Sequence, residues 1–314
     1  MSKEWAFCGI AELQAALAAG EVTSRGLVEY FRDRIEKLNP ALNAVVATNF
    51  DDALSRADAA DEARAKGDSW GPLHGIPMTI KDTFEVVGMP CTAGSRSLAK
   101  HIPAENAFTV QRLVDAGAIP FGKTNVPLFA GDLQSFNKVY GTTNNPHDTS
   151  RTPGGSSGGA AAALAAGLTP IELGSDLAGS IRTPSHFCGT YGHKPTHGII
   201  ASRGHIPGPP GMLLEPDLST PGPMTRHADD LDVMLDILAA PGPLMGSSWS
   251  LTLPEAPEKD LRGYKVLLGT QDSLSPIDDE LQAAYTELAA HLKSQGVDVT
   301  TGAPEGMSLE TFVP

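Results

Sequence analysis

Short apolar strands alternate with helical segments along nearly the whole chain, and this alternation limits the folds open to it. The predicted strands are residues 44–48, 76–80, 119–122, 170–174, 264–269 and 297–301. The predicted helices are residues 24–38, 51–66, 109–116, 158–167, 229–240 and 278–295. Such alternation predicts a layered α/β fold with a largely parallel or mixed sheet. Residues 202–224 are rich in proline and glycine, which predicts a long surface loop.

The composition is that of a folded, acidic protein. The chain has 314 residues, of which 41% are hydrophobic and 19% are charged. Its 23 basic and 37 acidic side chains give a formal charge of −14, which disfavours binding to a phosphate backbone. Its 3 cysteines do not form a disulfide framework, and we find no signal peptide or membrane span. We therefore expect a soluble, cytoplasmic protein with no nucleic-acid or membrane partner.

A glycine-rich loop with two hydroxyls precedes the alanine-rich helix predicted at 158–167. Residues 152–159 read TPGGSSGG. A phosphate-binding loop needs a lysine after its last glycine, but Ala160 stands there, and the dinucleotide-binding pattern is also absent. Taken alone, the loop is either a tight turn with a helix cap or a place where a serine takes part in chemistry.

Two other polar residues also lie just after predicted strands. Ser180 lies in a second glycine–serine loop, directly after the strand predicted at 170–174. Lys81 follows the apolar strand predicted at 76–80. Together with Ser156, they can act as a nucleophile, a relay and a base.

These motifs resemble the amidase signature family of serine hydrolases. The resemblance runs from about residue 10 to residue 270, and it rests on the segments 75–82 (GIPMTIKD), 122–125 (GKTN), 141–144 (GTTN), 152–159, 174–176 (GSD), 179–182 (GSIR) and 194–196 (KPT). It implies a single compact three-layer α/β/α domain with a mixed central sheet. In that domain, residues 1–70 form an N-terminal helical segment that packs on the core, and residues 71–314 form the amidase signature core. Since relatives are commonly longer, it stays open whether the C-terminal part is incomplete.

The resemblance also implies a catalytic triad. Ser180 would be the nucleophile, Ser156 a bridging serine that is often preceded by a cis peptide bond, and Lys81 the base. An ordinary lysine has a pKa of about 10.4, so Lys81 can act as a base only if burial favours its neutral form. We expect Asp82, the next residue along the strand, to point away from the amine.

The remaining site residues are implied by position. Backbone N–H groups of the loop before the nucleophile would form the oxyanion hole, namely those of Leu177, Ala178, Gly179 and Ser180. The sequence reads Asp-Leu-Ala-Gly-Ser where Asp-Thr-Gly-Gly-Ser is commoner, so Ala178 would restrict the loop if it needed a positive φ. Asp176 and Arg182 would hold this loop, or else form only a surface ion pair. The substrate-binding residues would be Phe129, Ala130, Gly131 and Asp132, and the segment 205–212 would cover the site.

We expect neither a metal nor a cofactor. His186 and Cys188 are potential ligands, but no further Cys or His pair is suitably spaced for zinc.

Three functions stay open. The first is an amidase that hydrolyses a small-molecule amide, or an ester or carbamate, through an acyl-Ser180 intermediate. The second is a glutaminase-type subunit of a tRNA-dependent amidotransferase, and the third is a truncated inactive scaffold. A homodimer also stays open.

Overall fold

The computed structural model describes residues 4–206, 215–255, 260–269 and 274–302. The chain divides into two compact units, Met1–Leu251 and Thr252–Pro314, which we describe separately. The predicted division into an N-terminal segment, 1–70, and a core, 71–314, stays a prediction.

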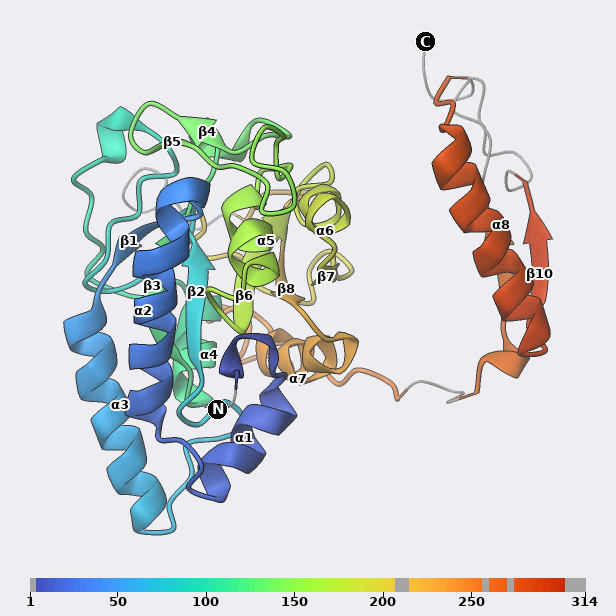
Figure 1. The fold of residues 1–314 in the computed structure, drawn as a ribbon. Coiled ribbons are helices and arrows are strands. Elements are labelled where there is room, and N and C mark those ends of the chain that lie inside the picture. Colours follow the sequence, from blue (N-terminus) through green and yellow to red (C-terminus); the bar gives the residue numbers. More distant parts are fainter. Residues whose placement is uncertain (1–3, 207–214, 256–259, 270–273, 303–314) are drawn as a thin grey trace. The chain divides into compact units, whose positions relative to one another are not determined.

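A six-stranded mixed sheet forms the centre of the first unit (Figure 1). Its strands, in spatial order, are β1 (Val45–Thr48), β3 (Ile119–Thr124), β2 (Pro77–Lys81), β6 (Ile171–Asp176), β8 (Thr220–Thr225) and β7 (Tyr191–Gly192). Strand β2 runs parallel to β3 and β6, whereas β1 pairs antiparallel with β3, and β8 pairs antiparallel with β6 and β7. This sheet and the helices around it confirm the predicted α/β fold with a mixed central sheet.

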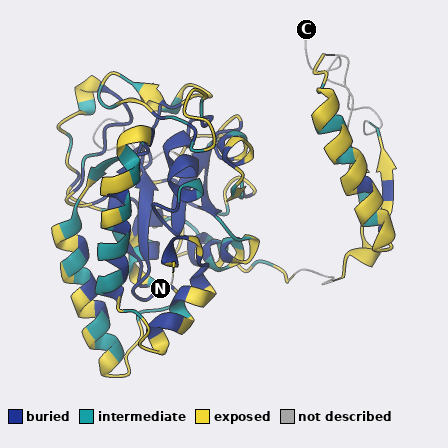
Figure 2. Cartoon of the chain, viewed as in Figure 1, coloured by how far each residue is buried: buried dark blue, intermediate teal, exposed yellow. Residues whose placement is uncertain are grey.

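Helices cover both faces of this sheet, and the four inner strands, β3, β2, β6 and β8, are almost entirely buried (Figure 2). The helices are α1 (Ile10–Ala18), α2 (Ser24–Leu42), α3 (Phe50–Ala65), α4 (Phe108–Asp115), α5 (Gly158–Ala165), α6 (Arg182–Cys188) and α7 (Ala228–Leu238). Phe31 of α2 and Ala162 of α5 pack with Phe121 of β3. Residues of α1, α4 and α7 pack in another cluster with Met78 and Ile80 of β2. A short hairpin, β4 (Phe136–Asn137) with β5 (Gly141–Thr142), lies outside the main sheet.

Helix α5 explains the alanine run. Every residue from Gly158 to Leu164 is buried. A Cβ atom at Gly159 would lie 2.3 Å from the backbone nitrogen of Asn125, just past the end of β3. Small residues therefore let this helix lie directly against the sheet, and the loop that precedes it reaches the end of β2.

The structure corrects one sequence prediction. Residues 220–224 were predicted as part of a surface loop, but they belong to the buried strand β8. The prolines of this segment favoured the loop prediction, because proline cannot donate a hydrogen bond to a neighbouring strand. The carbonyl of Pro223 accepts from His193 N at 3.1 Å, so this residue directs its backbone polar groups away from β6. Pro221, two residues earlier, faces the same way and is compatible with the β6 pairing.

The second unit is a β–α–β element. Strands β9 (Lys265–Leu268) and β10 (Asp298–Thr301) are parallel, and α8 (Asp279–Ser294) connects them. Ala289, Val297 and Val299 form its small buried cluster. Short 3-10 turns occur in both units, at Trp5–Phe7, Arg96–Leu98, Leu128–Ala130 and Leu261–Gly263. None of the helices that the structure describes is long and apolar enough to cross a membrane.

Candidate active site

Lys81, the last residue of β2, lies fully buried among serine oxygens. Its Nζ is 2.7 Å from Ser156 Oγ, 3.0 Å from Ser175 Oγ and 3.3 Å from the Ser175 carbonyl. Burial lowers the pKa of Lys81 from 10.5 to about 7, against the opposing charges of Asp176 and Glu172. A large fraction of this amine is therefore neutral near neutral pH, as a lysine base requires.

The neighbouring carboxylate does not pair with this amine. Asp82 accepts hydrogen bonds from the side chain and the backbone N–H of Thr92, and its Oδ1 lies 3.7 Å from Lys123 Nζ. The expectation that Asp82 points away from Lys81 agrees with these contacts.

The loop that carries Ser156 is held by backbone contacts on both sides. The Gly155–Ser156 peptide bond is cis, as the family resemblance implied. Ser135 Oγ accepts from Gly158 N at 3.0 Å and donates to the Gly154 carbonyl at 3.2 Å. A Cβ atom at Gly155 would lie 2.6 Å from Gln134 N, so glycine allows the loop to run against this segment.

Ser180 reaches the same place through its backbone. Ser157 N donates to the Ser180 carbonyl at 3.1 Å, which brings Ser180 beside Ser156. Ser180 is 7% exposed. The structure joins Lys81 to Ser156 directly. No hydrogen bond of the Ser180 hydroxyl occurs among the described residues.

Asp176 organises the loop before Ser180. Its carboxylate accepts from Gly179 N at 2.8 Å, Ile181 N at 3.0 Å and Arg182 N at 3.3 Å. The Arg182 guanidinium adds two further hydrogen bonds, of 3.0 and 2.9 Å. Burial alone would raise the pKa of Asp176, but the hydrogen bonds from Arg182 and the backbone amides hold it below its ordinary value. Asp176 therefore does more than form a surface ion pair, because it binds the backbone on both sides of Ser180.

The predicted oxyanion donors divide into two groups. Gly179 N–H donates to Asp176, whereas the N–H groups of Leu177, Ala178 and Ser180 have no hydrogen-bond partner within the described residues. The positive φ of this loop, 114°, lies at Gly179. Ala178 has no positive φ, so the alanine in place of the commoner glycine does not strain the backbone.

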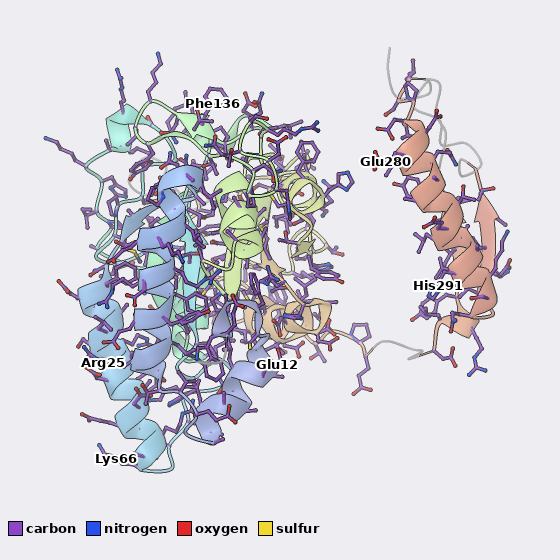
Figure 3. The ribbon with its side chains drawn as sticks, in the orientation of Figure 1. Glu12, Arg25, Lys66, Phe136, Glu280 and His291 are labelled. Atoms are coloured by element: carbon purple, nitrogen blue, oxygen red, sulfur yellow. The ribbon has the colours of Figure 1, made fainter. Side chains whose placement is uncertain are left out.

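The predicted substrate segment, 129–132, is joined to the Ser156 loop through Gln134. Phe129 and Ala130 adopt left-handed conformations, and Phe129 N donates to the Ala93 carbonyl at 2.7 Å. Asp132 Oδ1 accepts from Gln134 N, the atom beside Gly155. Phe129 is 47% exposed, and the nearby Phe136 of β4, labelled in Figure 3, is exposed as well. The substrate-binding role of this segment stays a prediction.

Two polar residues lie beside Lys81 to which the sequence assigned no such position. Ser175, from β6, contacts Lys81, and its Oγ also lies 2.8 Å from His205 Nε2. His205 begins the segment predicted to cover the site, of which residues 207–212 lie outside the described residues. Burial, together with the Lys81 charge, lowers the pKa of His205 to about 3. The family motif at 174–176 was the available signal for Ser175, but no local pattern placed His205 against it.

Metal ligands do not gather in the described residues. No group of three or more His, Cys, Asp or Glu side chains there could hold a metal ion. The sulfur of Cys188 instead lies 3.6 Å from the Pro153 carbonyl.

Comparison with known proteins gives relatives of one family. The sequence model of the Amidase family matches residues 26–309. The chain is 43% identical over 293 residues to a glutamyl-tRNA(Gln) amidotransferase subunit of Chloroflexus aurantiacus, covering 91% of this chain and 59% of that protein. It is 37% identical over 302 residues to an acylamidase of Rhodococcus erythropolis, covering 94% of this chain and 61% of that protein. The chain thus spans about three fifths of the length of these curated relatives.

Solved structures agree. The peptide amidase of Stenotrophomonas maltophilia superposes with a TM-score of 0.81 at 32% identity, covering 93% of this chain and 61% of that one. A bacterial aryl acylamidase of the amidase signature family superposes with a TM-score of 0.85 at 28% identity, covering 97% of this chain and 63% of that one. The chain therefore belongs to the amidase signature family.

Proposed function

We propose that this protein is an amidase that hydrolyses a carboxylic amide through an acyl-Ser180 intermediate. The observation that carries the proposal is the fully buried amine of Lys81, which lies 2.7 Å from Ser156 Oγ and has a pKa of about 7. A lysine kept neutral by burial and joined to a hydroxyl is a proton acceptor at the operating pH.

The proposed reaction begins with two proton transfers. Neutral Lys81 accepts the proton of Ser156 while Ser156 accepts the proton of Ser180, and Ser180 Oγ attacks the carbonyl carbon. This step requires the Ser180 hydroxyl to turn toward Ser156. The same relay then returns a proton to the leaving amine, and water hydrolyses the acyl-enzyme in a second cycle.

The developing oxyanion needs donors that are not already used. We assign them to the N–H groups of Leu177, Ala178 and Ser180, which have no partner among the described residues. Gly179 N–H donates to Asp176, so we assign it the role of shaping the loop. One such donor typically contributes about 3 kcal/mol to stabilising the transition state.

A second function has support from several of the relatives, which are amidotransferase subunits. The 43% identity to a glutamyl-tRNA(Gln) amidotransferase component favours a glutaminase that releases ammonia within a larger assembly. The same three residues would perform that reaction, with glutamine as the amide. The formal charge of −14 disfavours direct tRNA contact, so a partner protein would supply it.

A substrate panel separates these functions. Purified protein is assayed with aryl and alkyl amides, the matching esters and carbamates, and glutamine, with Ser180→Ala as the control. An amidase turns over simple amides without any partner protein, whereas a glutaminase component turns over glutamine and is stimulated by its partner proteins. Turnover of none of these compounds would favour the inactive scaffold, and full activity of Ser180→Ala would refute the triad.

A further inference from the structure

A histidine outside the triad is joined to its base by one serine. His205 Nε2 lies 2.8 Å from Ser175 Oγ, which lies 3.0 Å from Lys81 Nζ, which in turn lies 2.7 Å from Ser156 Oγ. His205 is buried, its ring packs on Phe84 with the ring centres 4.5 Å apart, and its backbone N–H donates to the Ser202 carbonyl at 2.9 Å. These contacts hold the imidazole at the end of a continuous chain of polar atoms.

The number of hydrogens on these polar groups restricts how the groups can hydrogen-bond to one another. A neutral amine has two hydrogens and one lone pair. If Lys81 is to accept the proton of Ser156, its lone pair must face Ser156. Its two hydrogens then point to the other oxygens in reach, the carbonyl and the Oγ of Ser175. Because Ser175 Oγ accepts from Lys81, its own hydrogen is left for His205 Nε2.

The state of the imidazole decides whether this arrangement can form. His205 is neutral at neutral pH, since burial and the Lys81 charge lower its pKa to about 3. With the ring hydrogen on Nδ1, Nε2 accepts from Ser175 and the Lys81 lone pair stays free. With the hydrogen on Nε2, the imidazole donates to Ser175, and the Ser175 hydrogen turns to the Lys81 lone pair. His205 Nδ1 has no partner among the described residues, so its contact with Ser175 is the only hydrogen bond of the ring there.

We propose that His205 is a positioning residue that accepts the Ser175 hydrogen and thereby keeps the lone pair of Lys81 directed at Ser156. The proposal rests on the proposed role of Lys81 as the base. It assigns His205 no contact with the substrate and no proton transfer of its own.

The variants that test this proposal are His205→Phe and His205→Gln. Phenylalanine keeps the ring against Phe84 but offers no acceptor, whereas the glutamine oxygen can reach the position of Nε2. The matched control is Ser202→Ala, three residues from His205, which removes a partly buried hydrogen bond to Glu215 and leaves the Lys81 contacts intact. We expect kcat/KM to fall about tenfold in His205→Phe, to return to within about threefold of the wild type in His205→Gln, and to stay unchanged in Ser202→Ala.

The pH profile distinguishes positioning from a structural defect. In His205→Phe the Ser175 hydrogen turns to the Lys81 lone pair, which stabilises the neutral amine and lowers the pKa of Lys81. The acidic limb of kcat/KM therefore moves to lower pH. A loosened, wetter site would instead raise the pKa toward its ordinary value and move the limb to higher pH. Asp176 and Glu172, the two acidic side chains that raise the pKa of Lys81 when ionised, are unchanged in all of these variants.

A measurement on the wild type decides the tautomer without an activity assay. In ¹⁵N spectra of histidine-labelled protein, assigned by the signals lost in His205→Gln, we expect Nε2 of His205 to resonate as an unprotonated nitrogen. A protonated Nε2 would overturn the proposal. So would an acidic limb that moves to higher pH, or a loss in His205→Phe that persists undiminished in a Ser175→Ala background. These outcomes leave the proposed function standing, since that function is tested separately by the substrate panel and by the Ser180→Ala variant.

Discussion

Lys81 Nζ and Ser156 Oγ lie 2.7 Å apart, although the two residues are separated by 75 positions in the sequence. Strand β2 brings the lysine to its end, and the glycine loop before α5 brings the serine to the same place. Both side chains are buried. Burial at this contact lowers the pKa of Lys81, so the lysine gains a neutral form at neutral pH that it lacks in water.

Replacing Lys81 by methionine should change how stability depends on pH. Between pH 7 and 10.5 the unfolded chain keeps a proton on Lys81 that the folded protein has released. Stability of the wild type therefore rises with pH in this window, relative to Lys81→Met, by up to about 1.4 kcal/mol per pH unit.

Urea unfolding of both proteins from pH 6 to 10.5 measures this difference. The exposed Lys66→Met, a position labelled in Figure 3, controls for removal of a charge. A constant difference between wild type and Lys81→Met across the window would mean that Lys81 is not held neutral.

Asp176 and Arg182 should contribute unequally to catalysis, although they form one ion pair. Asp176→Asn weakens the acceptor of three backbone N–H groups, so we expect kcat to fall about 100-fold with KM changed little. Arg182→Ala removes a side chain that is 57% exposed and leaves those backbone bonds in place, so its loss should be about tenfold or less. Steady-state kinetics on both variants gives the comparison, and equal losses would show that the ion pair matters more than the backbone contacts.

Regular elements near the site could be predicted from the sequence because each has a local signal. Thr23 caps α2 through Gly26 N, and glycines with positive φ follow α3 and α4 at Gly67 and Gly117. Strand β8 could not be predicted, because a proline fits within a sheet only where the neighbouring strand needs no hydrogen bond from its nitrogen. Whether Pro221 and Pro223 meet this condition depends on which neighbouring strand their backbone faces.

The site could likewise be predicted only in part. Family motifs identified Lys81, Ser156 and Ser180 as candidates, but the contact between Ser175 and His205 joins segments 30 residues apart and has no local pattern. The use of Gly179 N–H by Asp176 also depends on how the backbone turns. Hydrogen-bond partners chosen by tertiary packing cannot be obtained from spacing alone.

Glu172 should be protonated in the folded protein near neutral pH. It is fully buried in β6, where burial raises its pKa from 4.5 to about 8, and Thr79 Oγ1 bonds its carboxyl group. Between these pH values the folded state holds a proton that the unfolded state has lost, so wild-type stability falls as pH rises.

The isosteric variant Glu172→Gln has no such titration. We expect both proteins to unfold at similar urea concentrations near pH 4.5, and the variant to become the more stable one by pH 8. A difference that does not change over this range would contradict a buried neutral carboxyl at this position.

Gly159 should not tolerate a side chain. A Cβ atom there would lie 2.3 Å from Asn125 N and 2.8 Å from the Ala44 carbonyl, both backbone atoms that cannot move aside easily. We expect Gly159→Ala to lower the free energy of unfolding by about 3 kcal/mol. The control is Gly246→Ala, whose nearest neighbour would be 3.5 Å away, and its melting temperature should match the wild type. Equal melting temperatures for the two variants would contradict the close packing of α5 on the sheet.

The most direct test of the account is to trap the acyl group. The protein is mixed with an activated ester, quenched in acid within the first turnover, and digested for peptide mass spectrometry. We predict one acyl group on the peptide that contains Ser180, its absence in Ser180→Ala, and greatly slowed formation in Lys81→Met. An acyl group on another residue, or equal labelling of Ser180→Ala, would contradict the assignment of Ser180 as the nucleophile.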